Sequence, residues 1–163
     1  MSAAALLHSL YRQKAWINAH FFAGLDALDE ATRHTALRTL NHIHVVDRIF
    51  QGHLRGEPHG QASTNTPDTP TVEQLRASVA EVDEWYVAYT ATLAPEQLAE
   101  RIAFTFTDGD AGQMSREEML AHVITHGAYH RGEVGRLMKS ASAKPPRDLY
   151  TRFLHQTEPA RRG

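Results

Sequence analysis

Histidine spacing is the first feature of this sequence that could carry chemistry. The chain has 11 histidines among 163 residues, and His122, His126 and His130 follow one another at intervals of four. In an α-helix, which turns once in about 3.6 residues, this interval puts the three imidazoles on one face. Two imidazoles one turn apart can bind the same ion, at about 2.0 to 2.1 Å from each nitrogen. The pattern therefore indicates a metal site, and a pair of partly buried histidines bonded to backbone or solvent is the alternative.

A third ligand for such an ion has to come from a facing helix. The segment LNHIHVVDRIF offers His42, on the same side of its helix as the apolar Ile49. His44 lies two residues further on, about 200° around the helix, and is expected to be a surface or boundary residue. A single histidine such as His42 is by itself more often a core residue than a ligand, so its assignment depends on the pair that it faces. The predicted metal ligands are His42, His126 and His130.

Two neighbours of the histidine pair are candidates for the surroundings of the ion. His122 lies one turn before His126, where the stripe drifts off centre, so we expect a pocket residue rather than a ligand. Glu133 follows His130 by three residues and can accept a hydrogen bond that fixes the imidazole tautomer, with a solvated charge as the alternative. The other histidines share no spacing and are assigned no role: His8, His20, His34, His53, His59 and His155.

Four helices are expected to position these residues. Residues 3–24 and 29–54 carry apolar side chains at intervals of three and four, and Ser2 can cap the first of the two segments. Capping boxes of the form Thr-x-x-Gln and Ser-x-x-Glu predict two further helices, over residues 71–93 and 115–141.

The connections between these helices differ in character. Residues 55–70 are rich in Pro, Gly, Ser and Thr and predict a long, exposed connection. Residues 101–107 alternate between apolar and polar side chains ahead of an Asp108-Gly109 turn signal, which predicts a short hairpin. The segment DLYTRFLH near the C-terminus is expected to form one last helical turn on the other helices.

The length and composition agree with one helical domain. A chain of 163 residues that is 42% hydrophobic and 22% charged can bury a core of its own. The predicted fold class is all-α, a four-helix bundle that makes a single domain of residues 1–163. A long connection between the second and third helices suits a bundle with a crossover.

Charge and composition also limit the partners. The net charge is −2 and no basic stripe is present, so nucleic-acid binding is not expected and the partner is predicted to be a small molecule. No cysteine is present, so any metal must sit on nitrogen and oxygen ligands. No apolar run reaches the roughly 18 to 20 residues of a membrane span, and the predicted location is the cytoplasm.

Two segments carry a family resemblance that extends over essentially the whole chain. LNHIHVVDRIFQGHLRG resembles the second-helix motif of the DinB-like (YfiT-like) metalloproteins, and HVITHGAYHRGEVGRLM resembles their fourth-helix motif. The resemblance implies an up-up-down-down four-helix bundle with a divalent ion, commonly nickel or zinc, at one end of its core. It also implies a homodimer in many members. Carried over residue by residue, the family's ligands fall on His42, His126 and His130.

Two positions depart from the family pattern. Tyr129 stands where a second histidine often precedes the last ligand, and Glu133 stands where glutamine is common. Neither position is a ligand in the family. The departures therefore concern the polarity and charge of the pocket rather than the binding of the metal.

The open coordination of a three-histidine site suggests a function. Three neutral imidazoles leave a position for water or substrate, as in catalytic rather than structural sites. The predicted function is a metal-dependent enzyme, hydrolase or thiol S-transferase, in which the ion lowers the pKa of its bound water or polarises an oxygen or thiol of the substrate. The alternative is a non-catalytic metal-binding or dimerisation module of stress-response type, whose ion a fourth protein ligand would close off. The candidates to line the pocket are Trp16, Asn18, Phe22, Tyr129 and the long connection.

Overall fold

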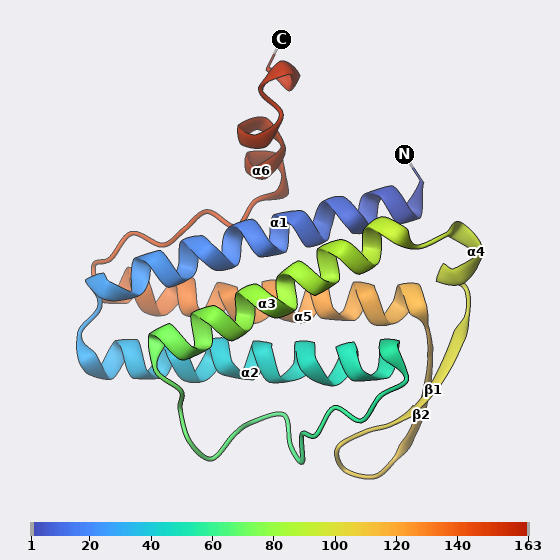
Figure 1. Cartoon of the computed structure of the whole chain (residues 1–163). Helices are drawn as coiled ribbons and strands as arrows, with labels where there is room; N and C mark the ends of the chain where they lie inside the picture. Colours follow the sequence, from blue (N-terminus) through green and yellow to red (C-terminus); the bar gives the residue numbers. More distant parts are fainter. Residues whose placement is uncertain (1, 163) are drawn as a thin grey trace.

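The computed structural model describes residues 2–162, which form six α-helices and one two-stranded sheet (Figure 1). The long helices are α1 (Ala3–Gly24), α2 (Glu30–Arg55), α3 (Val72–Thr92) and α5 (Arg116–Ser140). The shorter elements are α4 (Pro95–Leu98), α6 (Tyr150–Thr157) and the 3-10 turns Leu25–Ala27 and Pro159–Arg161. The predicted helical fold, with one small hairpin, is confirmed.

Side-chain caps define where the long helices begin. The hydroxyl of Ser2 accepts a hydrogen bond from the backbone of Ala5 at the start of α1. Thr71 and Ser115 each form a complete capping box, in which the third helical residue bonds back to the cap. Each cap satisfies backbone donors that the helix itself cannot, which contributes about 1 kcal/mol. Gly56 ends α2 with a φ of 68°, a left-handed conformation that glycine adopts without strain.

The directions of the helices correct the predicted up-up-down-down order. In Figure 1, α1 and α5 run from right to left, whereas α2 and α3 run from left to right. The order is therefore up-down-down-up. The physical reason is the short link over residues 25–29, which can span at most about 20 Å. Helix α1 has 22 residues and is about 33 Å long, so the chain cannot return along it before α2 begins.

The apolar core lies between the four long helices, where α1 packs mainly on α3 and α2 packs mainly on α5. One part of the core surrounds Phe21 and Val134, and the other surrounds Phe50, Tyr86 and Val123. All five of these side chains are buried. Burial of one such side chain contributes roughly 1.5–3 kcal/mol, so packing rather than helix propensity holds the helices together. No helix among residues 2–162 has an apolar stretch long enough to cross a membrane.

The hairpin consists of β1 (Arg101–Thr105) and β2 (Ala111–Ser115), which pair antiparallel beside the end of α2. Phe104 lies opposite Gly112 in the register. A Cβ at Gly112 would lie 2.7 Å from ring atoms of both Phe104 and Phe106. The glycine therefore leaves the room in which the two phenylalanine rings lie against the strand.

Candidate metal centre

Three histidines from two helices meet where α2 packs on α5. One ring nitrogen from each of His42, His126 and His130 lies within 4.8 Å of the other two. The Nε2 atoms of His42 and His126 are 3.1 Å apart, and the rings of His126 and His130 are 4.6 Å apart between centroids. The structure thus brings together the three residues that the spacing singled out, one from α2 and two from α5. We call these three residues the histidine triad.

Two residues of the triad have their tautomer set by a hydrogen-bond acceptor. The Nδ1 atom of His42 lies 2.9 Å from the backbone oxygen of Thr64, and Nδ1 of His130 lies 2.7 Å from a carboxylate oxygen of Glu133. Because a carbonyl or carboxylate oxygen only accepts, each Nδ1 must carry the proton and donate it. The lone pair of each imidazole is therefore on Nε2. Such outer hydrogen bonds are usual for histidines that bind metals.

Burial has a strong effect on the pKa of His126, the triad member that lies between His122 and His130 on α5. Burial lowers the pKa of His126 to about 3, and the neighbouring His130, His42 and His122 lower it further in the same direction. Its imidazole is therefore neutral at physiological pH, as a metal ligand must be. Within residues 2–162 its buried Nδ1 has no hydrogen-bond partner.

The donor set of the triad fits a divalent ion. Two nitrogens bound to one tetrahedral ion at 2.0 to 2.1 Å lie about 3.3 Å from each other. The 3.1 Å between Nε2 of His42 and Nε2 of His126 is close to that separation. That these residues bind a metal stays a prediction.

A buried arginine fixes the helix that carries two of these histidines. Arg131 follows His130 and is 1% exposed, and its Nε donates to Asp148 at 2.7 Å. Its Nη1 lies 3.4 Å from the side-chain oxygen of Asn18 on α1. A Cβ on Gly127 would lie 3.0 Å from Nη1, so the glycine leaves space for the guanidinium. These contacts hold α5 against α1 and the C-terminal segment.

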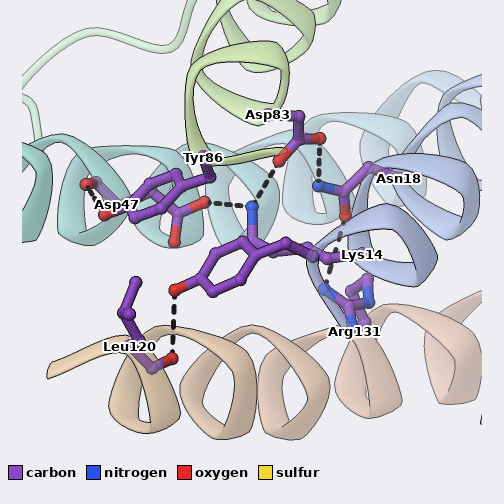
Figure 2. Close-up of polar contacts among 8 residues, drawn as sticks. Lys14, Asn18, Asp47, Asp83, Tyr86, Leu120 and Arg131 are labelled. Atoms are coloured by element: carbon purple, nitrogen blue, oxygen red, sulfur yellow. Dashed lines mark hydrogen bonds and ion pairs between the residues drawn. The ribbon is translucent and has the colours of Figure 1, made fainter. Parts of the chain in front are cut away.

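A second buried polar cluster joins α1, α2 and α3, as Figure 2 shows. The ammonium of Lys14 lies 2.7 Å from Asp47 and 2.5 Å from Asp83, and Asn18 donates to Asp83 at 2.8 Å. Burial alone would lower the pKa of Lys14, but the two carboxylates outweigh it and raise the pKa above its ordinary value. We call Lys14, Asp47 and Asp83 the buried ion cluster.

The sequence analysis did not predict the buried ion cluster, although the positions of its three charged residues among apolar ones were a signal for it. Lys14 lies three residues from both Tyr11 and Ile17, in the middle of the apolar stripe of its helix. Asp47 and Asp83 hold equivalent positions on α2 and α3. A charged residue on the apolar face of three helices requires partners, and these three residues provide them for one another.

The predicted neighbours of the ligands lie at different depths. His122 is half-buried, with its ring 5.6 Å from that of His126 and 4.6 Å from that of Phe50. Burial lowers the pKa of His122. Tyr129 is 70% exposed, although its ring is only 5.0 Å from the ring of His130. His122 therefore faces the interior of the site, whereas Tyr129 lies at its outer edge.

A pocket of about 410 Å³ opens beside the triad and has His42, His122 and His126 in its wall. The other lining residues come from the end of α2, the long connection and the hairpin: Val46, Ile49, Phe50, His53, Thr64, Phe104, Phe106, Thr107 and Met114. The alternation of residues 101–107 predicted the hairpin, but no local pattern placed it in the wall of this pocket.

Three residues that were candidates for the pocket lie elsewhere. Asn18 and Phe22 line a groove of about 570 Å³ between α1 and α3, and Trp16 lines a depression beside Pro145. They lie on α1, which packs on α3 rather than on the face of α2 that carries His42. Of the candidates for the lining, the long connection does contribute, through Thr64.

His44 differs from its prediction as a surface or boundary residue. It is only 7% exposed, and burial lowers its pKa to about 4. The long connection folds back over this side of α2, so that Gln61 and Thr66 lie with His44 around a second pocket of about 550 Å³. A connection that reads as exposed in sequence thus covers a face of α2 that would otherwise meet solvent.

Comparisons with known proteins place the whole chain in one family. A family model described as the DinB family matches residues 8–162. The chain is also similar to protein DinB of Bacillus subtilis (strain 168), with 24% identity over 168 residues. That match covers 93% of this chain and 96% of the Bacillus protein.

Proposed function

The chain belongs to the DinB family, and on this premise we propose that it is a metal-dependent enzyme built on a four-helix bundle. In this proposal His42, His126 and His130 hold one divalent ion, nickel or zinc, and the partner is a small molecule. The observation that carries the proposal is the pair of hydrogen bonds that leaves the lone pairs of His42 and His130 on Nε2, in a group whose ring nitrogens lie within 4.8 Å of one another.

The openness of the cluster supports an enzyme rather than a closed structural site. Within residues 2–162 the group of potential ligands consists of the three histidines, without a carboxylate or a fourth imidazole. A structural zinc site has four protein ligands, whereas a catalytic site has three and leaves a position open. The pocket beside His42 and His126 gives a small molecule access to that position.

The reaction class follows from the ligands and from the residues around them. When bound, a divalent ion on three imidazoles supplies a Lewis acid that polarises an oxygen or sulfur atom of a substrate. Glu133 holds the proton on Nδ1 of His130, and the carbonyl of Thr64 does the same for His42. Apolar residues of the hairpin line the pocket beside the triad. Hydrolysis and thiol transfer are the two reactions that this arrangement suits.

The experiment that tests the metal site is elemental mass spectrometry on purified protein. The native chain, loaded with zinc or nickel and desalted, should hold about one ion per chain, and a His42→Ala, His130→Ala double variant should hold none. His126→Ala should also abolish stoichiometric binding, whereas His44→Ala should retain it, because His44 lies in a different pocket. A well-folded native chain that takes up no ion would contradict the proposal.

Turnover separates an enzyme from a binding module. Metal-loaded protein should convert at least one compound from a panel of hydrolase and thiol-transfer substrates, and His126→Ala should not. If the protein binds a stoichiometric amount of metal but converts neither the hydrolase nor the thiol-transfer substrates, the non-catalytic metal-binding or dimerisation module would be favoured.

We also propose a homodimer, which the family resemblance implies. The groove between α1 and α3 is the surface that suits a second copy, since it is lined by the small residues Ala15, Ala19, Ala80 and Ala88. Light scattering on the protein as it elutes from a size-exclusion column should give twice the mass of the 18.2 kDa chain. A monomer at micromolar concentration would contradict this part of the proposal.

A further inference from the structure

Apolar side chains line much of the pocket beside the triad. The apolar residues come from α2 and from the hairpin segment: Val46, Ile49, Phe50, Phe104, Phe106 and Met114. The rings of Phe50 and Phe104 are 6.3 Å apart between centroids, and those of Phe104 and Phe106 are 4.8 Å apart. Three aromatic rings in contact thus form a continuous apolar surface next to the triad.

The same pocket contains no permanently charged side chain. Among residues 2–162, no carboxylate, ammonium or guanidinium lines it, and its polar groups belong to histidines and threonines. Burial lowers the pKa of His53, and the nearby His59 lowers it further, so His53 is neutral at neutral pH. A charged group that entered this pocket at the end away from the triad would lose its hydration without gaining an ionic partner.

The size of the pocket admits more than a water molecule. It measures about 410 Å³. An apolar protein cavity of about 150 Å³ is large enough to hold benzene. The volume beside the triad therefore accommodates an aromatic ring with several further carbons, or an alkyl chain.

At the rim of the pocket, one aromatic ring is only partly covered by other side chains. Phe106 is 47% exposed, among the most exposed of the large apolar residues, and Gly112 leaves the space in which its ring lies. Leaving this ring in water costs free energy that a bound apolar group would recover by covering it. The exposure of Phe106 is therefore a second observation that favours an apolar ligand.

From these observations we infer that the small molecule bound at the triad carries an uncharged alkyl or aromatic group, which lies between Phe50, Phe104 and Phe106. The inference rests on the proposed function, because the triad places the reacting oxygen or sulfur at one end of this pocket. The hairpin is then the element that selects the substrate, and the triad is the element that binds the reacting atom.

Three hydroxamates that differ only in the part remote from the metal test this inference. Acetohydroxamic acid, octanohydroxamic acid and the monohydroxamate of suberic acid carry the same zinc-binding group. Their remote ends are a methyl group, an alkyl chain and a chain of equal length that ends in a carboxylate. Calorimetric titration of the zinc-loaded protein should show octanohydroxamic acid binding at least tenfold more tightly than acetohydroxamic acid. Each buried CH2 group contributes about fourfold in affinity. The carboxylate-ended compound should lose this advantage.

Substitutions in the pocket test which residues are responsible for the preference for an alkyl chain. Phe106→Ala should cut the advantage of octanohydroxamic acid several-fold and leave the affinity for acetohydroxamic acid unchanged. Because Phe106 is half-exposed, this variant keeps the hairpin folded, and Phe104→Leu provides a second test inside the pocket. Leu149→Ala is the matched control, since Leu149 is 52% exposed and does not line the pocket.

The outcomes distinguish the two proposals. Zinc that binds stoichiometrically, together with equal affinities for the three hydroxamates, would overturn the apolar pocket and leave the metal site intact. An alkyl advantage that survives both Phe106→Ala and Phe104→Leu would also overturn it, because the chain would then lie elsewhere. A native protein that binds no zinc would overturn the proposed function and this inference with it.

Discussion

The imidazole of His130 and the carboxylate of Glu133 lie one helical turn apart on α5, with Nδ1 donating to Oε2 over 2.7 Å. The side chain of Glu133 is 44% exposed, so the contact lies at the edge of the site rather than in the core. Its role is therefore to orient His130 and to increase the electron density on its Nε2, more than to stabilise the fold.

Replacing Glu133 is expected to weaken metal binding without unfolding the protein. In Glu133→Ala, His130 loses the acceptor that holds its tautomer, and the affinity for zinc or nickel should fall about 10- to 100-fold. Competition with a chromophoric chelator measures this change. Glu81→Ala, which removes an exposed carboxylate from α3, is the control and should bind metal as the native chain does. Equal affinities in the two variants would mean that Glu133 is only a solvated charge.

Removing the cation of the buried ion cluster should destabilise the fold. In Lys14→Met two buried carboxylates, those of Asp47 and Asp83, lose their shared partner, which costs about 3–5 kcal/mol of unfolding free energy. Urea denaturation measures the loss. Lys144→Met changes an exposed lysine in the same way and should stay within about 0.5 kcal/mol of the native chain. If the two variants were equally stable, the cluster would contribute nothing to stability.

Asp47 should give the stability a characteristic pH dependence. Burial raises the pKa of Asp47 from 3.8 to about 6, against the opposing effect of Lys14. The folded chain therefore binds this proton between about pH 4 and 6, where the unfolded chain does not, and the contribution of Asp47 to stability falls as the pH rises through that range. Asp47→Asn removes the titration. The unfolding free energy of the variant minus that of the native chain should thus rise from pH 4 to pH 6, by ~2–3 kcal/mol.

The measurement for Asp47 is urea denaturation at several pH values, with a chelator present so that bound metal does not contribute. Groups that do not interact with Asp47 titrate alike in both proteins and cancel in the difference. A difference that stays level or falls between pH 4 and 6 would show that the ion pair with Lys14 dominates over burial.

The C-terminal segment is expected to loosen when Asp148 is changed. Asp148 accepts hydrogen bonds from Gln13 at 2.5 Å and from Arg131 at 2.7 Å, and so ties the segment before α6 to α1 and α5. Asp148→Asn leaves the buried guanidinium without its counter-charge. Hydrogen exchange of residues 142–157 should become faster by at least tenfold. Asp110→Asn, at an exposed position in the hairpin turn, should leave that exchange unchanged.

Local chemistry allowed the elements of the fold to be predicted. The caps at Ser2, Thr71 and Ser115 were visible in sequence because each depends on residues within one helical turn, and all three form. The alternation ahead of Asp108 and Gly109 predicted the hairpin for the same reason. The histidine triad was recognisable because two of its members share one helix face, and only the third had to be sought at a distance.

The features that were not predicted depend on contacts between distant segments. His44 is buried beside a pocket that the long connection and α3 line together, and periodicity within α2 carries no information about either. The up-up-down-down order came from the family resemblance and was wrong, although the short link over residues 25–29 already requires α2 to run back along α1. The placement of Phe104 and Phe106 in the wall of the pocket beside the triad likewise depends on how the hairpin meets α2.

The buried ion cluster has a consequence for how a metal would reach the triad. Lys14, Asp47 and Asp83 join α1, α2 and α3, and Arg131 with Asn18 attaches α5, so all four long helices are fastened without an ion (Figure 2). Small zinc domains, by contrast, are unfolded until their metal arrives. Here the chain is expected to finish folding first and to acquire its ion afterwards. The identity of the ion would then be decided by which divalent metal the surroundings supply, and a cell could exchange one for another without dismantling the protein.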